Sequence, residues 1–163
     1  MKKIIIVRHA KSSWTDFSLS DFNRPLDKRG FKDAPIMASR IKKSMNLPVI
    51  MYSSTALRAQ TTANFFSVEF NVPVHDVKDL YHGQPEDYLS VIKSVDEHFN
   101  CVALFGHNPG ITIIANLIKM GSSDNIPTCG VIVAEFNGSL WAQVEWESMR
   151  LVELMFPKDI NYD

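Results

Sequence analysis

Two histidines directly follow apolar segments of strand length, and these junctions are the parts of the chain best suited to chemistry. His9 follows Arg8 at the end of the apolar run at residues 4–7, and His107 follows Gly106 after the run at residues 101–105. Continuous apolar runs of this kind predict strands buried in a parallel sheet. Ligands of such sheets bind beyond the carboxyl ends of the strands. An arginine beside an imidazole at that edge suits an anionic substrate and covalent catalysis.

The junction at residues 106–110 also predicts the start of a helix. Asn108 can cap that helix, and Pro109 fits its first turn, where a missing N–H costs nothing. His107 would then lie between a strand end and a helix N-terminus, where N–H groups and the helix dipole favour an anion. Gly106 is expected to allow a close approach of the backbone.

A third segment of interest follows the short apolar run at residues 49–52. Ser53 or Ser54 is predicted to be the N-cap of the next helix, and Arg58 falls about one turn into it. An exposed helical arginine is one interpretation. The other places its guanidinium at the same end of the sheet as the two histidines, where its planar donors match phosphate oxygens.

Taken together, these segments resemble the histidine phosphatase superfamily, in the branch that includes the phosphoglycerate mutases. Within that branch the chain looks most like the small SixA-type phosphohistidine phosphatases. Ala10, where the wider superfamily usually has glycine, is typical of that group. The matching segments come in the family order and extend over most of the chain, at residues 7–14, 24–26, 29–30, 53–59, 61–63, 80–81 and 106–110.

The resemblance implies a mechanism and a set of site residues. His9 would be the nucleophile and form a phosphohistidine intermediate, which water would hydrolyse. Arg8, Arg58 and His107 would surround the phosphoryl oxygens and stabilise the transition state. No metal and no other cofactor would be required. The residues expected to contact substrate are Ser12, Trp14, Arg24 and Asn108, although packing at the pocket edge is an equal interpretation of Trp14.

The general acid is the point at which the chain departs from the wider family. Many members carry a glutamate shortly after a leucine in the segment that follows the third strand, and His82 stands there in this chain. Glu86, four residues later, is a second candidate, but it also fits the first turn of a helix, where the dipole favours a carboxylate. A missing glutamate favours a phosphoramidate, or another substrate whose leaving group is easily protonated.

Two further functions remain open. One is a module that binds phosphate or a phosphoprotein without turning it over, and the other is a small-molecule phosphomonoesterase or mutase. Binding modules of the superfamily usually lack the nucleophile or one of the arginines that surround the phosphoryl oxygens. Because Arg8, His9, Arg58 and His107 are all present, the sequence favours the enzyme, acting on a phosphate-bearing substrate.

Composition limits the class of protein. The chain has 163 residues, 45% of them hydrophobic, and a formal net charge of −1, which predicts a single globular domain over residues 1–163. Basic residues do not cluster, so a nucleic-acid partner is not expected, and the apolar runs are too short to span a membrane. Cys101 and Cys129 form no metal or redox motif, which predicts buried thiols and a cytoplasmic location.

The pattern of apolar residues predicts alternating strands and helices. Asn137-Gly138 is a hairpin signal, residues 151–156 fit a strand or a short helix, and the polar stretch at residues 12–23 is predicted to be a mobile loop. The expected fold is therefore α/β, phosphoglycerate mutase-like, with three α/β/α layers and a mainly parallel sheet that has an antiparallel edge hairpin. Strands are predicted near residues 2–7, 48–52, 72–76, 101–106, 130–136 and 140–146, and helices near 31–45, 54–67, 86–98 and 109–120.

Overall fold

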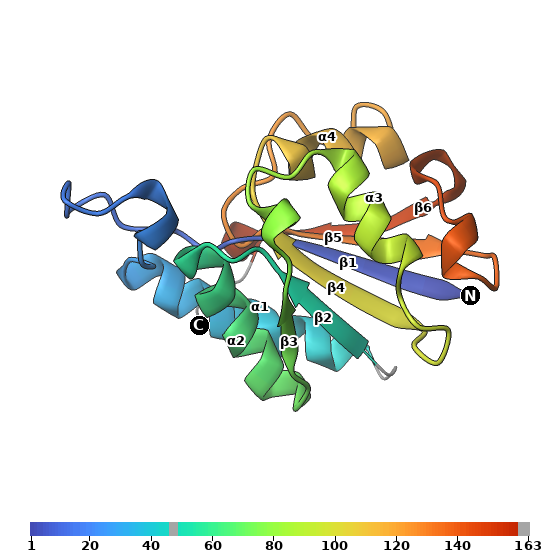
Figure 1. The fold of residues 1–163 in the computed structure, drawn as a ribbon, viewed down its shortest axis with the longest axis horizontal. Helices are drawn as coiled ribbons and strands as arrows, with labels where there is room; N and C mark the ends of the chain where they lie inside the picture. Colours follow the sequence, from blue (N-terminus) through green and yellow to red (C-terminus); the bar gives the residue numbers. More distant parts are fainter. Residues whose placement is uncertain (46–48, 160–163) are drawn as a thin grey trace.

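A six-stranded sheet forms the centre of the computed structural model, which describes residues 1–45 and 49–159. The strand order is β3-β2-β4-β1-β5-β6 (Figure 1). Strands β1 to β4 pair in parallel, whereas β5 is antiparallel to β1 and β6 is antiparallel to β5. The strands span β1 (Lys2–Arg8), β2 (Val49–Ser53), β3 (Val74–Asp76), β4 (Cys101–Gly106), β5 (Val131–Phe136) and β6 (Arg150–Met155).

Four α-helices cover the two faces of this sheet. Helices α1 (Lys28–Ser44) and α2 (Leu57–Phe70) pack on one face, and α3 (Pro85–Lys93) and α4 (Gly110–Ile118) pack on the other (Figure 1). The expected three-layer α/β/α fold is therefore confirmed. None of the helices in the described part of the chain is long and apolar enough to cross a membrane.

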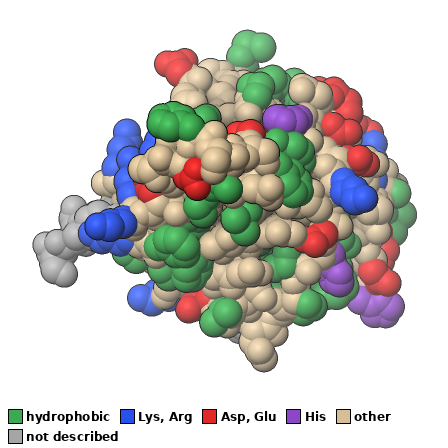
Figure 2. Space-filling model, turned by 60° about the vertical axis from the view of Figure 1, so that its left-hand side comes forward, with side chains coloured by type: hydrophobic (Ala, Val, Ile, Leu, Met, Phe, Trp, Pro, Cys, Tyr) green, Lys and Arg blue, Asp and Glu red, His purple; other side chains and the backbone are tan. Residues whose placement is uncertain are grey.

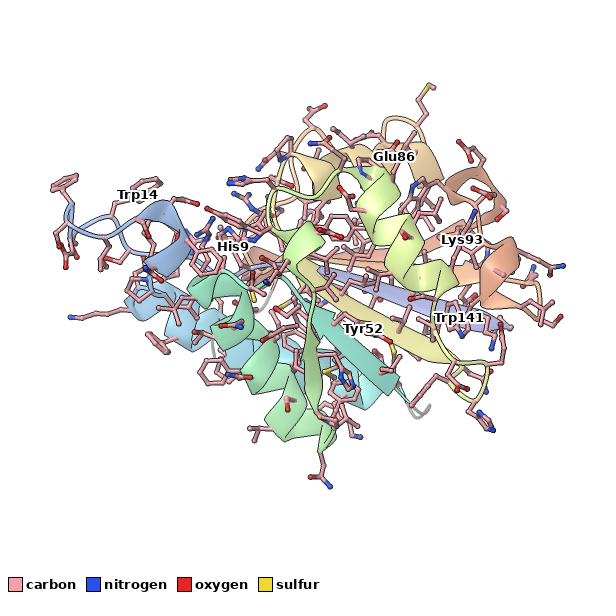
Figure 3. All side chains as sticks on the ribbon, in the orientation of Figure 1. His9, Trp14, Tyr52, Glu86, Lys93 and Trp141 are labelled. Carbon is pink, nitrogen blue, oxygen red and sulfur yellow. The ribbon has the colours of Figure 1, made fainter. Side chains whose placement is uncertain are left out.

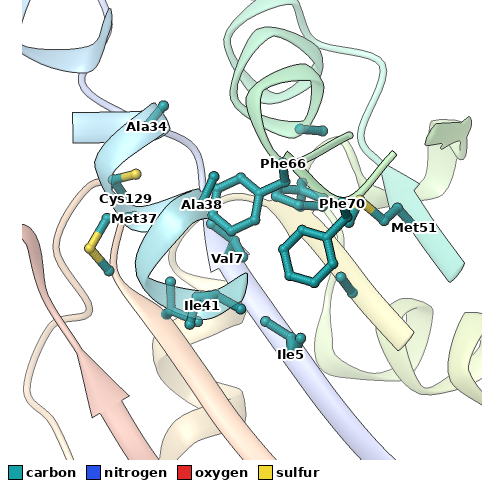
Figure 4. Close-up of a cluster of buried hydrophobic side chains, with 14 of the residues drawn as sticks. Ile5, Val7, Ala34, Met37, Ala38, Ile41, Met51, Phe66, Phe70 and Cys129 are labelled. Carbon is teal, nitrogen blue, oxygen red and sulfur yellow. The ribbon is translucent and has the colours of Figure 1, made fainter. Parts of the chain in front are cut away.

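The central part of β1, residues 4–7, is apolar because both of its faces are buried. Ile5 and Val7 point into a cluster with the side chains of α1 and α2, which Figure 4 shows in close-up. Ile4 and Ile6 point into a second cluster with side chains of α3 and α4. The charged residues of β1 therefore lie at its ends, Lys2 and Lys3 at the amino end and Arg8 at the carboxyl end.

The helix limits differ from the sequence predictions where side chains form unforeseen hydrogen bonds. Helix α1 begins three residues early because the Asp27 carboxylate accepts the N–H of Gly30 at 2.8 Å. Helix α2 begins only at Leu57, and the predicted caps Ser53 and Ser54 do not cap it. Arg58 consequently lies in the first turn of α2.

Two later helices end earlier than the sequence predicted. Helix α3 ends at Lys93 rather than at residue 98, and the Asp96 side chain accepts the N–H of His98 in a turn. Helix α4 ends at Ile118, two residues earlier than predicted. The predicted start of β2 at residue 48 lies outside the described residues.

The predicted hairpin at Asn137-Gly138 is wrong, although the antiparallel edge exists. Residues 140–146 form no strand; short 3₁₀ helices occupy Trp141–Gln143 and Trp146–Ser148 instead. Trp141 is fully buried, and its indole N–H donates to the carbonyl of Phe99. Its burial on the α3 side keeps this segment from the sheet edge, and β6 pairs with β5 there.

Candidate active site

The candidate site lies where three parallel strands end side by side. The register pairs Arg8 of β1 with Gly106 of β4, so the loops after both strands start together. The His9 N–H donates to the carbonyl of Gly106 at 2.9 Å. The ring centroids of His9 and His107 are 5.1 Å apart. The structure therefore brings the two histidines of the sequence pattern into one pocket.

The hydrogen bonds of His9 determine which of its nitrogens has the lone pair. Nδ1 lies 2.8 Å from the carbonyl oxygen of Ala10, which can only accept, so Nδ1 carries the proton. Nε2 then keeps its lone pair and accepts a hydrogen bond from Nε of Arg58 at 3.3 Å. Burial, helped by the charges of Arg58 and Arg8, lowers the pKa of His9 to about 3. The imidazole is consequently neutral at pH 7.

Arg58 is held on two sides besides its contact with His9. Its Nη1 donates to the backbone carbonyl of Asp21 at 2.6 Å, and its Nη2 donates to Asp21 Oδ2 at 3.0 Å. One turn later in α2, the Thr62 hydroxyl donates to the Arg58 carbonyl and accepts the N–H of Ala10. The first turn of α2 is thus fastened to the loop after β1.

Arg8 and His107 each present a buried nitrogen without a hydrogen-bond partner among the described residues. For Arg8 it is Nε, while its Nη1 donates to the carbonyl of Ile126 at 2.8 Å. For His107 it is Nδ1, while its Nε2 lies 2.7 Å from the Ser54 hydroxyl. Burial, together with the charges of His9 and Arg58, lowers the pKa of His107 to about 3. Buried unpaired polar groups are costly, which points to a ligand that supplies acceptors.

Close packing behind His107 fixes its backbone. A Cβ on Gly106 would lie 1.9 Å from the hydroxyl oxygen of Tyr88. That hydroxyl oxygen accepts the N–H of His107 at 3.1 Å. The close approach at Gly106 is thus made by a side chain of α3.

Two residues of the pocket were missed by the sequence analysis. Asp21 lies in the 3₁₀ helix Asp21–Asn23, where its Oδ2 accepts from Arg58 and from the Tyr81 hydroxyl at 2.8 Å. Partial burial acts to raise the pKa of Asp21, but hydrogen bonds from Tyr81 and Arg58 hold it at about 2. An aspartate in a loop with no periodic pattern carries no signal of such a role. Tyr81 stood in a matching segment, but without an assigned role.

Three of the expected substrate contacts form one wall beside Asp21. Arg24 donates through Nη1 to Asp21 Oδ1 at 3.0 Å and through Nη2 to the Ser12 hydroxyl. The guanidinium carbon of Arg24 lies 3.2 Å from the centroid of the Trp14 ring, a cation–π contact. Trp14 thus packs on Arg24 while its side chain stays largely exposed, and a contact with substrate stays a prediction.

The Asn108 amide is used within the protein instead of facing a substrate. Its carbonyl oxygen accepts from the N–H and the hydroxyl of Thr112, and its amide group donates to Asn125 Oδ1 and to the carbonyl of Ile126. These contacts exhaust the hydrogen-bonding capacity of the amide. The carbonyl oxygen of Ile126 also accepts a hydrogen bond from Nη1 of Arg8. Asn108 therefore helps to position Arg8 through the carbonyl that both side chains share.

We call Arg8, Arg58 and His107 the cage. The two candidates for the general acid are exposed side chains that form no hydrogen bond with the cage among the described residues. His82 is exposed, has left-handed backbone with φ of 58°, and stacks its ring on Tyr81 at 4.0 Å. Glu86 is exposed on the first turn of α3, apart from His9 (Figure 3). Within the described residues, no hydrogen bond joins either side chain to His9, Arg58 or His107.

The arrangement combines a neutral imidazole that keeps a lone pair with two arginines and a second histidine. Cations and unpaired donors around one lone pair suit attack on a group that carries several anionic oxygens, such as a phosphoryl group. No group of three or more His, Cys, Asp or Glu residues in the described chain could hold a metal ion.

Comparisons with known proteins identify the family to which the chain is similar. A sequence model of the histidine phosphatase superfamily, branch 1, matches residues 4–84. An uncharacterised chloroplastic protein of Arabidopsis thaliana is 29% identical over 87% of this chain and 70% of its own length. A structure from Agrobacterium tumefaciens assigned as a phosphohistidine phosphatase SixA is 26% identical, with a TM-score of 0.80 over 96% of this chain and 98% of that one.

A second solved structure shares the fold at lower identity. It is the protein histidine phosphatase SixA in complex with tungstate, which is 19% identical, with a TM-score of 0.76 over 96% of this chain and 98% of that one. The sequence model covers His9 and Arg58, and the structural match extends over 96% of the chain. On this combined ground, the chain belongs to branch 1 of the histidine phosphatase superfamily and is SixA-like.

Proposed function

We propose that the protein is a phosphatase that forms a phosphohistidine intermediate on His9 and acts on phosphohistidine protein, or on another phosphorylated compound with a good leaving group. One observation carries the proposal. The neutral His9 imidazole, with its Nε2 lone pair facing Arg58, lies beside two buried nitrogens that have no partner among the described residues, Arg8 Nε and His107 Nδ1. A phosphoryl group has the acceptors that Arg8 Nε needs, and that His107 Nδ1 needs in the tautomer that carries its proton there.

In the first step, His9 Nε2 attacks phosphorus, the new P–N bond forms, and the bond to the leaving group breaks. The Nδ1–H···O=C bond to Ala10 favours the positive charge that the ring gains in this step. Arg8 and Arg58 offset the charge on the phosphoryl oxygens. If the Ser54 hydroxyl donates to Nε2 of His107, the His107 proton lies on Nδ1 and can be donated to the same oxygens.

In the second step, water attacks phosphorus, the P–N bond breaks, and inorganic phosphate leaves. Burial and the nearby arginines, which keep the pKa of His9 at about 3, disfavour a cationic ring. That environment makes the neutral imidazole a good leaving group, so hydrolysis of the intermediate is favoured as well.

The substrate preference follows from the lack of a proton donor hydrogen-bonded to the cage. Among the described residues, neither His82 nor Glu86 forms a hydrogen bond with the cage or with His9, and Asp21, with a pKa of about 2, is ionised and cannot donate a proton at pH 7. An imidazole leaving group is protonated near neutral pH and needs little help, whereas an alcohol does. The likeness to SixA proteins, one of them named a protein histidine phosphatase, supports the same substrate class. The buried thiols of Cys101 and Cys129 fit the cytoplasm, which stays part of the proposal.

The test is to trap the intermediate. Wild-type protein mixed with a ³²P-labelled substrate and quenched without acid should carry an acid-labile, base-stable phosphoryl group. His9→Ala should lose both the label and turnover, whereas His98→Ala, a change of an exposed histidine, should keep both. Near-normal turnover by His9→Ala would show that the nucleophile is another group.

The same experiment separates the remaining functions. Binding of phosphate without any turnover by the wild-type protein would indicate a binding module. Turnover that transfers phosphate to a second hydroxyl rather than to water would indicate a mutase.

A further inference from the structure

Exposed apolar side chains gather in one short segment beside the cage. Trp14, Phe17, Leu19 and Phe22 are all exposed large hydrophobic residues, and we call them the apolar lip. The sequence predicted a polar, mobile loop here. Single exposed apolar residues are ordinary on protein surfaces, but a cluster of them marks a site of interaction.

The apolar lip projects from the body of the molecule. Figure 1 shows residues 12–20 extending beyond the first turns of α1, and Figure 3 places Trp14 farther out than His9. Figure 2 turns this side of the molecule toward the reader, and several hydrophobic side chains reach its surface. Phe17 is 92% exposed, so its ring packs against almost nothing in the chain itself.

Polar side chains of the same segment stabilise the shape that leaves the apolar ones outside. Asp16 accepts hydrogen bonds from both the N–H and the hydroxyl of Ser18, at 3.0 and 2.6 Å. The hydroxyl of Ser13 contacts that of Thr15 at 2.9 Å. The hydrogen-bonding groups are thus used within the loop, while Phe17 and Leu19 face solvent.

The apolar lip is continuous with the wall of the cage. Phe22 packs edge-on against Tyr81, with ring centroids 5.1 Å apart, and Tyr81 in turn donates to Asp21. At the other end, Trp14 covers Arg24, which also bonds to Asp21. A partner that rests on the apolar lip therefore lies over the entrance to His9.

We infer that the apolar lip is the docking surface for a folded protein substrate whose surface around the phosphorylated side chain is apolar. This inference rests on the proposed function and adds its partner. His9 is only 7% exposed, so the phosphorylated side chain must enter the cage while the rest of the substrate stays outside. A small phosphorylated molecule held in the cage gains nothing from Phe17, whereas a protein surface can bury that ring. A second copy of this chain bound to the apolar lip would cover the cage of the first molecule and keep substrate out. This argues against a second copy as the occupant.

The test compares protein and small substrates in one double variant, Phe17→Ser with Leu19→Ser. The matched control is Val68→Ser, because Val68 is 82% exposed but lies in the last part of α2, away from Arg58. The probes are folded proteins phosphorylated on histidine with phosphoramidate, some with apolar and some with charged surroundings, together with free phosphohistidine and p-nitrophenyl phosphate. Circular dichroism checks that each variant keeps its fold.

The inference requires a selective loss. For the proteins with apolar surroundings, kcat/KM of the double variant should fall by about ten-fold or more, mainly through KM, because exposed aromatic anchors dominate protein interfaces. Turnover of both small probes should stay within about two-fold of wild type, and Val68→Ser should match wild type on every probe.

Three kinetic outcomes would overturn the inference and leave the phosphatase proposal standing. They are an equal loss on small and protein probes, no loss on proteins, and a wild-type protein that cleaves no phosphoprotein faster than free phosphohistidine. A wild-type dimer in light scattering that the double variant abolishes would assign the apolar lip to a second copy instead. The absence of His9-dependent turnover on every probe would refute the proposed function itself.

Discussion

At the scale of single residues, the environment of His9 makes it available for attack over a wide pH range. The carbonyl of Ala10 holds the proton on Nδ1, and burial with Arg58 and Arg8 nearby lowers the pKa of the ring. Arg58 is oriented in turn by both the backbone and the carboxylate of Asp21. The site thus combines a neutral imidazole, the proposed nucleophile, with fixed positive charge, the resource on which phosphoryl transfer depends most.

The proposed lack of a general acid gives a prediction at the same scale. Phosphohistidine and aryl phosphates should be cleaved faster than alkyl phosphates, such as a phosphoserine peptide, by about 10²–10⁴-fold, the usual contribution of a general acid. His82→Ala and Glu86→Ala should change phosphohistidine turnover by only a few-fold. Arg58→Ala should reduce it by about a hundred-fold or more.

Steady-state rates on matched aryl and alkyl esters provide the measurement. Similar rates on the two ester classes would reveal an efficient acid. A loss in His82→Ala or Glu86→Ala that is confined to alkyl esters would identify it.

At the scale of elements, the contact between α3 and the end of β4 positions His107. Tyr88 of α3 is fully buried against Gly106, and its hydroxyl oxygen accepts the N–H of His107. The helix thus sets both the space available to the strand end and the direction of the next residue. A residue outside the cage thereby influences a residue inside it.

Gly106→Ala should consequently destabilise the protein and weaken catalysis. The added Cβ overlaps the Tyr88 hydroxyl, and overpacking of this kind typically costs about 1–3 kcal/mol. Urea unfolding measures the loss in free energy. Tyr88→Phe removes the overlapping oxygen, so the double variant should regain part of the stability, and additive losses would contradict the contact.

At the scale of the whole molecule, the two buried histidines couple stability to pH. Both pKa values are lowered to about 3, below the value of about 6.5 in the unfolded chain. Between these values the unfolded chain binds protons that the folded chain does not, so stability is complete above about pH 6.5 and falls as the pH falls. From pH 7 to pH 5, each histidine should lower the free energy of unfolding by about 2 kcal/mol.

Urea unfolding at several pH values checks this coupling. His107→Gln removes one of the two groups, so its stability should fall less steeply between pH 7 and pH 5 than that of the wild type. Parallel curves for the variant and the wild type would contradict a neutral, buried His107.

For the molecule as a whole, the positive charge of the cage also predicts that activity needs no divalent metal ion. The cage offers Arg8, Arg58 and His107 in place of a cation, and the described residues contain no group of three or more His, Cys, Asp or Glu that could hold one. Turnover of p-nitrophenyl phosphate should therefore survive exhaustive treatment with EDTA. A loss that magnesium or zinc restores would show that a metal takes part.

The sequence by itself determined the features that depend on local pattern. Apolar runs such as residues 4–7 predicted buried parallel strands, and the polar residues placed directly after them predicted that His9 and His107 meet at one edge of the sheet. Helix periodicity predicted the layers of helices on the sheet, and the order of the family motifs predicted that Arg58 lies at the site. These inferences succeeded because strand burial and the geometry of a parallel sheet follow from short stretches of sequence.

Only the tertiary structure decided what depends on partners distant in sequence. Asp21 forms hydrogen bonds with Arg58 and Tyr81 from a loop without periodicity. Trp141 lies in a 3₁₀ helix where a strand was predicted, because its side chain is buried on the α3 side. Asn108 was expected at the substrate, yet its amide is saturated by Thr112 and by residues of the following loop. Side-chain hydrogen bonds and burial between separate segments form only when the chain has folded, so no local pattern in the sequence encodes them.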